Sequence, residues 1–231
     1  MKQNKPLFIG ITGGIGAGKS EILDYIGKHY RCEIYLADQV AHQVKRAGTE
    51  CFRALVGLLG EEIKAPDGEI DREKMAERIF ADPGVLEQVN GIIHPAVRDF
   101  LLERLETARR EGQVELFFVE AALLIECGYG QLVDEMWYVY ADEAVRRRRL
   151  AESRGYSGEK TDSIMARQLS EEHFRENCGF IIDNSGSMAD SYRQIDRIVE
   201  GFTWQECEKD WESWCWVWIL AREALLVVWD I

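Results

Sequence analysis

The residues best suited to do chemistry lie near the start of the chain, in a glycine-rich segment that ends in lysine and serine. Residues 13–20 read Gly-Gly-Ile-Gly-Ala-Gly-Lys-Ser, which fits the P-loop pattern G-x-x-x-x-G-K-S. Glycines let backbone N–H groups wrap closely around phosphate, and the start of the following helix favours an anion. We expect Lys19 to reach the β- and γ-phosphates of a nucleoside triphosphate and the Ser20 hydroxyl to ligate Mg²⁺.

The elements around this segment are those that a P-loop needs. The apolar run Leu7–Ile11 precedes it and predicts a strand, and the pattern of Glu21–Ile26 after it predicts a helix. An ordinary glycine-rich turn is the alternative, but the motif and its strand–loop–helix setting agree. The motif does not identify the group that receives the phosphate.

A carboxylate follows the second predicted strand, Cys32–Leu36, at Asp38. In a parallel sheet the carboxyl ends of the strands meet at one edge, so Asp38 is expected near the P-loop. There it can orient a hydroxyl that attacks the γ-phosphate, or accept its proton. Taken alone, Asp38 reads more readily as a helix N-cap. Its place opposite a P-loop favours the catalytic role.

A second acid, Glu120, follows the third predicted strand, Val114–Val119. P-loop proteins place an acid at such a strand end to position Mg²⁺ or its waters. The alternative is a solvated carboxylate at the end of a strand. Glu120 is therefore a candidate metal ligand together with Ser20.

Five arginines gather around the end of a predicted helix, at residues 146–149 and 154. Neighbours on a helix are about 100° apart, so some of these side chains must be solvated. Arg146, Arg149 and Arg154 are the candidates to converge on phosphate, where a guanidinium neutralises developing charge. Helices around a glycine-containing loop favour a lid that excludes water during transfer.

His94-Pro95 is predicted to separate two helices, Pro83–Ile93 and Pro95–Glu111, because proline suits a first helical position. His94 is then either a capped or packed histidine or a contact for the acceptor.

Strand and helix patterns alternate along the chain, which predicts an α/β fold with a parallel sheet and helices on both faces. The remaining predicted strands are Glu135–Tyr140 and Phe180–Ile182. The remaining predicted helices are Lys19–Lys28, Gln39–Lys45, Thr49–Leu59, Arg72–Phe80, Glu143–Ser153, Lys160–Ser170 and one that starts near Met188.

Composition narrows the class of protein. The chain has 231 residues and a formal net charge of −13, which argues against a general binder of nucleic acid or of anionic membranes. Six scattered cysteines without a C-x-x-C pair do not predict a zinc site. Residues 1–6 lead straight into a predicted strand, so we expect no signal peptide. We expect a cytoplasmic location, where the cysteines would be free thiols.

Residues 203–231 differ from the rest, because they hold six of the seven tryptophans. The apolar part is interrupted by Arg222 and Glu223 and is too short and charged for a confident membrane span. A docked helix or an altered extension are the alternatives, and no role is predicted.

Many kinases share a P-loop, but this chain also carries an ordered set of more specific elements. These are Ala37-Asp38 with Ala41-His42, Ile70-Asp71-Arg72, Ile79-Phe80-Ala81-Asp82, Asn90–Pro95, Leu123-Leu124-Ile125-Glu126, Arg154-Gly155-Tyr156-Ser157, Gln168 and Ile182–Gly186. With these elements, the chain from about Leu7 to Gly201 resembles the dephospho-CoA kinase family.

This resemblance implies ATP-dependent, Mg²⁺-assisted phosphorylation of the ribose 3′-hydroxyl of dephospho-CoA, the last step of coenzyme A biosynthesis. The implied fold is a three-layer P-loop NTPase fold with a five-stranded parallel sheet, in one domain over residues 1–202. Its core would be residues 1–38, 112–142 and 178–202, its helical acceptor-binding region about 40–110 and its helical lid about 143–177. A monomer or weak homo-oligomer is expected, with residues 203–231 as an extension.

By position in the family pattern, Asp38 resembles the catalytic base, and Arg149 and Arg154 resemble the lid arginines. Lys19 is expected to act in catalysis together with these residues. His42, His94 and Leu123 are expected to contact the acceptor along with Asp38. The expected ATP-binding residues are Gly13, Gly14, Ile15, Gly16, Ala17, Gly18, Lys19, Ser20 and Glu21.

Some residues depart from the family pattern, among them Glu21 where threonine is usual and Glu120 where aspartate is common. Neither removes a group that the reaction requires. Two alternatives remain open: a nucleoside or nucleotide kinase of the P-loop class, and an ATP-binding regulatory module without catalysis. The carboxylate at Asp38 argues against the second, because a binder needs no base there.

Overall fold

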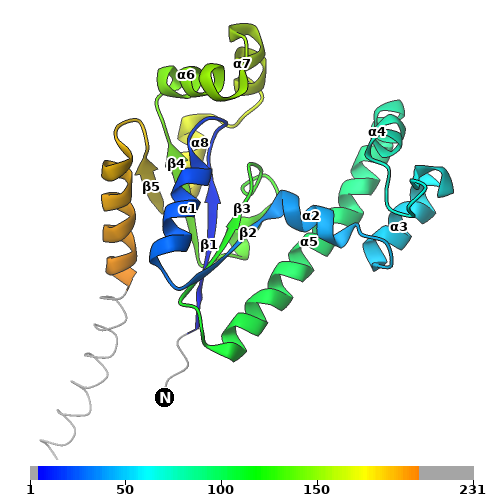
Figure 1. Ribbon diagram of the computed structural model, residues 1–231, viewed down its shortest axis with the longest axis horizontal. Coiled ribbons are helices and arrows are strands. Elements are labelled where there is room, and N and C mark those ends of the chain that lie inside the picture. Colours follow the sequence, from blue (N-terminus) through cyan, green and yellow to red (C-terminus); the bar gives the residue numbers. More distant parts are fainter. Residues whose placement is uncertain (1–4, 203–231) are drawn as a thin grey trace, which may run out of the picture. The chain divides into compact units, whose positions relative to one another are not determined.

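A computed structural model describes residues 5–202 of the chain. Within that range, five strands form one sheet in the order β2-β3-β1-β4-β5 (Figure 1), and every neighbouring pair is parallel. The strands are β1 (Leu7–Thr12), β2 (Cys32–Leu36), β3 (Leu116–Glu120), β4 (Glu135–Tyr140) and β5 (Phe180–Asp183). The predicted α/β fold with a five-stranded parallel sheet is therefore confirmed.

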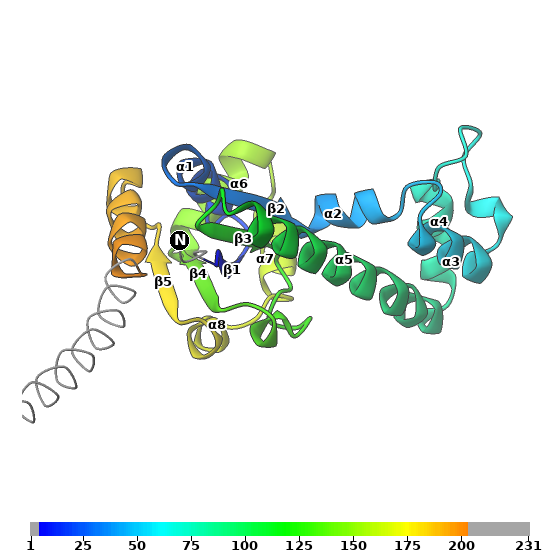
Figure 2. The same cartoon turned by 90° about the horizontal axis from the view of Figure 1, so that it is seen from below.

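The sheet is buried on both faces. Phe117, Phe118 and Val119 of β3 are fully inaccessible to solvent, as expected for a continuous apolar run in the centre of a parallel sheet. α1 covers one face and α8 the other (Figures 1 and 2). This gives the three layers that the sequence predicts.

Helices connect the strands and build the rest of the described chain. They are α1 (Lys19–His29), α2 (Ala37–Val44), α3 (Glu50–Leu59), α4 (Arg72–Ala81), α5 (Pro83–Glu111), α6 (Glu143–Arg154), α7 (Gly158–Met165) and α8 (Glu171–Asn177), with two 3₁₀ turns, η1 (Glu61–Ile63) and η2 (Tyr129–Gln131). Residues up to Ser185 form one compact unit. Residues 188–202 form a helix of the second unit, and the Ser187 hydroxyl accepts a hydrogen bond from the Asp190 N–H at its start.

Strand register brings the three candidate segments to one edge of the sheet. Glu120 pairs with Ile11 of β1 on one side and with Leu36 of β2 on the other. Because all three strands are parallel, the P-loop, the start of α2 and Glu120 meet at their carboxyl ends, where ligands of such sheets bind.

α2 and α5 run side by side away from the sheet toward α3 and α4 (Figure 2). The prediction of two helices separated at His94-Pro95 is wrong, because α5 continues through Pro95 for 29 residues. Proline removes one hydrogen bond from a helix interior. Here Val89, Val97, Leu101 and Leu105 lie on one buried face that spans the proline, and their packing outweighs that loss.

The prediction of one helix over Lys160–Ser170 is also wrong. α7 ends at Met165, and a new helix, α8, starts after Ser170, whose hydroxyl accepts a hydrogen bond from the His173 N–H. Serine followed by two acids, Glu171 and Glu172, is an N-terminal signal that could have revealed α8.

None of the helices within residues 5–202 combines the length and apolar character needed to cross a membrane. The Trp-rich segment 203–231 lies outside the described residues.

Candidate active site

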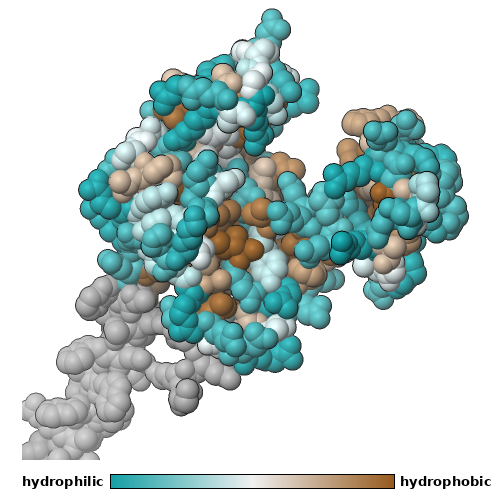
Figure 3. All heavy atoms as spheres, viewed as in Figure 1, coloured by the Kyte–Doolittle hydropathy of each residue, from teal (hydrophilic) through white to brown (hydrophobic). Residues whose placement is uncertain are grey.

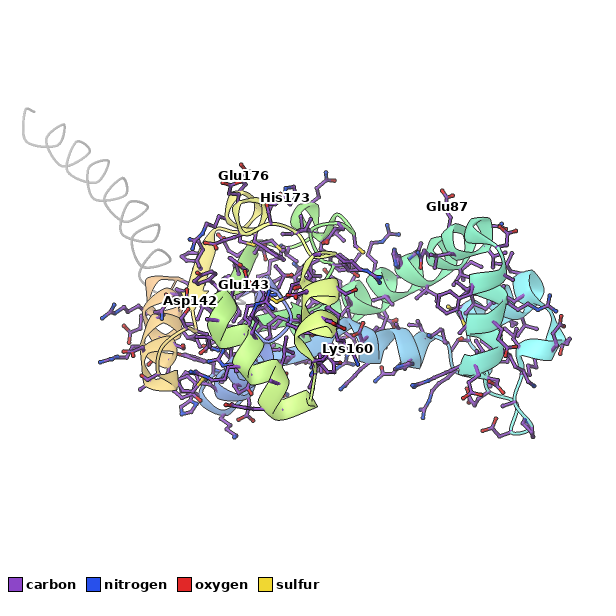
Figure 4. The ribbon with its side chains drawn as sticks, turned by 90° about the horizontal axis from the view of Figure 1, so that it is seen from above. Glu87, Asp142, Glu143, Lys160, His173 and Glu176 are labelled. Carbon is purple, nitrogen blue, oxygen red and sulfur yellow. The ribbon has the colours of Figure 1, made fainter. Side chains whose placement is uncertain are left out.

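A cavity of about 720 Å³ opens at the edge of the sheet where the P-loop, α2 and β3 meet. α6 and α7, which carry the labelled Glu143 and Lys160 in Figure 4, supply further residues that line the cavity. The predicted site residues that line it are Gly14, Ile15, Gly16, Gly18, Lys19, Ser20, Glu21, Asp38, Glu120, Arg149 and Arg154.

Two glycines of the P-loop are required by their backbone geometry. Gly13 has φ +150°, and a Cβ there would lie 2.4 Å from the Val139 carbonyl oxygen of β4. Gly18 has φ +93° and starts α1, and a Cβ there would collide with Asn184 at 2.2 Å. As the N-cap of α1, Gly18 offers no side chain to cap the helix, which leaves its positive end open to an anion.

Lys19 is held at the centre of the cavity. Its Nζ donates a hydrogen bond to the Gly13 carbonyl at 2.8 Å and lies 3.5 Å from Glu120 Oε1. Burial lowers the pKa of Lys19, partly offset by Glu120, and burial likewise raises the pKa of Glu120. Both charges have lost water, so a phosphate oxygen is a favourable further partner for the ammonium group.

Asp38 is the second residue of α2, and it lines the same cavity from the opposite side. The N-cap of α2 is Leu36, and no side chain caps that helix, so the alternative of Asp38 as an N-cap is wrong. The negative charge of Asp38 contributes to the raised pKa of Glu120. The carboxylates of Asp38 and Glu120 therefore interact electrostatically and line the same cavity.

The arginines of α6 fall into two groups, those that point toward the P-loop and those that are exposed, because neighbouring residues of a helix face different directions. Arg146 Nε donates to the Ile15 carbonyl at 2.8 Å, and Arg149 Nη2 donates to the Asn184 carbonyl at 2.9 Å. Arg147 instead pairs with Glu143 and Asp162 on the exposed side. Arg154, at the end of α6, lies 6.0 Å from the Tyr156 ring centre and lines the cavity.

Comparison with known proteins gives this arrangement a family. The family model described as dephospho-CoA kinase matches residues 7–190. The dephospho-CoA kinase of Geobacter sulfurreducens is 38% identical over 193 residues, 82% of this chain and 95% of the relative. The chain belongs to the dephospho-CoA kinase family. The resemblance seen in the motifs is confirmed, and with it the activity of the last step of coenzyme A biosynthesis, with ATP as co-substrate.

Solved structures agree with the fold. The structure of TT1252 from Thermus thermophilus has a TM-score of 0.68 and 28% identity, covering 85% of this chain and 97% of that one. The dephospho-CoA kinase of Campylobacter jejuni has a TM-score of 0.64 and 21% identity, covering 86% of this chain and 98% of that one.

Two amide side chains of this dephospho-CoA kinase fold brace the P-loop. Gln168 Oε1 accepts hydrogen bonds from the Ile15 N–H at 3.1 Å and from Arg146 Nη2 at 2.7 Å. Asn184 is buried, and its Nδ2 donates to the Ala17 carbonyl at 2.8 Å. Both residues belong to the family pattern in the sequence, but no local spacing assigned them a role.

Three predicted acceptor contacts are not among the residues that line this cavity. His42 lies beside Arg72, with 3.2 Å between His42 Nε2 and Arg72 Nη2. His94 lines a different cavity of about 340 Å³, with Arg98 and Tyr129. Leu123 is 57% exposed.

Ser20 and Glu120 fit a magnesium ion by the chemistry of their donors. Both line the cavity, and hydroxyl and carboxylate oxygens are the ligands that Mg²⁺ takes, alongside water and substrate phosphates. No group of three or more histidine, cysteine or acidic side chains within residues 5–202 is placed to hold a metal.

Proposed function

We propose that Asp38 is the catalytic base for phosphorylation of the ribose 3′-hydroxyl of dephospho-CoA. The observation that carries this proposal is that Asp38, from α2, shares one cavity with Lys19 and Ser20 of the P-loop. A donor held by the P-loop and an acceptor held at α2 then meet between the two. A protein that only bound ATP would have no need of a carboxylate there.

In the proposed step, the 3′-hydroxyl loses its proton to the Asp38 carboxylate as its oxygen attacks the γ-phosphorus of ATP. A new oxygen–phosphorus bond forms, and the bond from the γ-phosphorus to the bridging β–γ oxygen breaks. ADP leaves with that electron pair, and protonated Asp38 returns its proton to water.

Charge on the transferring group is to be neutralised by Lys19, Arg149 and Arg154. Lys19 is already fixed by Gly13, and Arg149 by Asn184, so neither needs to reorganise during transfer. Mg²⁺, held by Ser20 and Glu120, would supply further neutralisation of the phosphate oxygens. The residues Gly13–Glu21 form the ATP cradle in this proposal, with Gln168 and Arg146 supporting its backbone.

The proposed acceptor contacts still include His42, His94 and Leu123. We also propose that the protein is a monomer or weak homo-oligomer and that it is located in the cytoplasm. The domain limits remain proposals too: a kinase domain over 1–202, with an acceptor region at about 40–110 and a lid at about 143–177.

A coupled assay of ADP release tests the function. The full chain, ATP and Mg²⁺ are given dephospho-CoA or a panel of nucleosides and nucleoside monophosphates, and ³¹P NMR locates the new phosphate. We expect rapid ADP release with dephospho-CoA and a 3′-phosphate in the product. Faster release with a nucleoside or nucleotide would overturn the proposed acceptor, and tight ATP binding without transfer to any of these compounds would favour a regulatory module.

A further inference from the structure

Three basic side chains gather beside Asp38 on the helical region, and the ATP cradle does not use them. They are His42 of α2, Lys45 at the C-cap of α2, and Arg72 at the start of α4. We refer to His42, Lys45 and Arg72 as the basic cluster. His42 and Arg72 are exposed and Lys45 is partly exposed, so the cluster is open to a ligand.

The positive charges of Lys45 and Arg72 disfavour each other and disfavour a protonated His42, whose ring lies within hydrogen-bond distance of Arg72. Burial and then the charges of Arg72 and Lys45 lower the pKa of His42. Burial and then the charge of Arg72 lower the pKa of Lys45. The two cations, Lys45 and Arg72, create a local positive potential that attracts an anion.

Within residues 5–202, Lys45 and Arg72 of this cluster take part in no ion pair. Other cations of α4 have partners, since Lys74 pairs with Asp71 and Arg78 pairs with Glu62. In the part of the chain that the structure describes, no carboxylate lies within ion-pair distance of Lys45 or Arg72. Asp38 is the carboxylate whose charge reaches both His42 and Lys45.

Helix geometry fixes where the cluster stands relative to the reacting group. Asp38 and His42 are four residues apart on one face of α2, and Lys45, three residues after His42, is the C-cap that ends this helix. One turn, about 6 Å along the axis, separates Asp38 from His42. Figure 3 shows a largely hydrophilic surface over this helical region, as a polar ligand requires.

The acceptor carries its anion in the matching place. In dephospho-CoA the 3′-hydroxyl and the 5′-diphosphate are substituents of the same ribose. We propose that the basic cluster binds this 5′-diphosphate and thereby sets the 3′-hydroxyl against Asp38. This inference rests on the proposed function and assigns a subsite of the same active site.

Arg72 carries the largest share of the binding in this subsite. Its guanidinium offers a planar fork of N–H donors that matches phosphate oxygens, and charge-assisted hydrogen bonds of this kind are the strong ones. The whole chain has a net charge of −13, so an anionic acceptor is repelled on average and needs local positive charge to bind.

Calorimetric titration of dephospho-CoA into the full chain, with a non-hydrolysable ATP analogue and Mg²⁺ present, tests the subsite. Arg72→Ala and Lys45→Ala should each weaken dephospho-CoA binding at least about tenfold. Arg72→Lys, which keeps charge but loses the fork, should recover part of that loss. Lys74→Ala removes the same charge from the same helix and should change the affinity less than about twofold.

Salt dependence and a fold control separate recognition from a structural role. Raising the salt concentration should weaken dephospho-CoA binding less in Arg72→Ala than in wild type, while circular dichroism and the affinity for the ATP analogue stay unchanged. If Arg72→Ala and Lys45→Ala bind dephospho-CoA as Lys74→Ala does, the subsite is wrong although the function stands. If wild type releases no ADP with dephospho-CoA, the proposed function itself fails.

Discussion

Two parts of the active site differ in how their charges are satisfied: a donor wall, made by the P-loop and α6, and an acceptor wall, made by Asp38 and by the basic cluster, whose residues lie outside the lining of the cavity. On the donor wall, Lys19 and Arg149 are already hydrogen-bonded to carbonyl oxygens of the P-loop and of Asn184. On the acceptor wall, Lys45 and Arg72 have no carboxylate partner in the described chain. On the proposed function, the groups of the donor wall are therefore already held by the protein, whereas the acceptor wall would be completed by the charge of its ligand.

This difference predicts different kinetic results for the two walls. Substitutions on the donor wall should lower kcat, because they remove groups preorganised for the transition state. Substitutions in the basic cluster should raise KM for dephospho-CoA.

The largest effect is expected for Lys19→Ala. This change removes the ammonium group that lies in the cavity and should lower kcat by about 10³-fold or more. Steady-state ADP release at saturating substrates measures it. A kcat close to that of wild type would remove Lys19 from the mechanism.

The next effect is expected for Asp38→Asn, which keeps the shape of the side chain but removes its charge and its ability to accept a proton. We predict a loss of at least about 10²-fold in kcat, while ATP binding changes little. Rapid-quench kinetics and calorimetry with the ATP analogue measure the two quantities. An unchanged kcat would mean that Asp38 does not act as the base and that this part of the site only binds the acceptor.

A smaller effect is expected for Glu120→Gln. The change keeps a hydrogen-bonding group near Lys19 but removes a proposed oxygen ligand, so the Mg²⁺ concentration for half-maximal rate should rise about tenfold. A magnesium titration of ADP release measures it. Glu115→Gln, an exposed residue next to the same strand, is the matched control and should leave the titration unchanged. Equal curves for both variants would argue against metal binding by Glu120.

Gln168→Ala tests the brace beneath the P-loop. It removes the acceptor that joins the Ile15 N–H to Arg146, so KM for ATP should rise about three- to tenfold. KM for dephospho-CoA should stay within about twofold. A rise confined to dephospho-CoA would contradict the assignment of Gln168 to the donor wall.

The smallest effect is expected for Thr49→Ala in the helical region. The Thr49 hydroxyl caps α3 by accepting from the Phe52 N–H at 3.0 Å, and losing it should cost about 1 kcal/mol of the free energy of unfolding. Thermal unfolding should shift down by about 2–4 °C. Thr49→Ser keeps the hydroxyl and should restore most of the melting temperature, whereas a large loss of kcat in Thr49→Ala would couple this cap to catalysis.

The donor wall could be predicted almost entirely from the sequence, because a P-loop is local: Gly13 to Ser20 are consecutive, and the following helix starts at Lys19. Asp38 and Glu120 were found by a simple topological rule, that parallel strands end at one edge. Gln168 and Asn184 escaped a physical prediction, since each meets the P-loop from more than 150 positions away in the chain.

The helical region was harder to predict for a different reason. Pro95 marks a boundary by local propensity, yet α5 passes through it because its buried face continues on both sides. No signal in the sequence marked the basic cluster as a group, since Arg72, the first residue of α4, meets His42 of α2 only in the folded chain. Tertiary contacts decide both points, and a local reading of the sequence does not contain them.

Because α5 is long, a small rotation at its sheet end produces a large displacement at its far end. At 29 residues the helix is about 44 Å long, so a rotation of one degree at its sheet end moves its far end by about 0.8 Å. Misplacement of reacting groups by about 1 Å can cost about 10²-fold in rate. Near the sheet, Arg104 donates to the Tyr35 hydroxyl at 2.8 Å, and Tyr35 stacks on Phe117 at 5.0 Å between ring centres. If the helical region binds the acceptor as proposed, the rigidity of these contacts at the sheet end of α5 would limit how far that region moves relative to the P-loop.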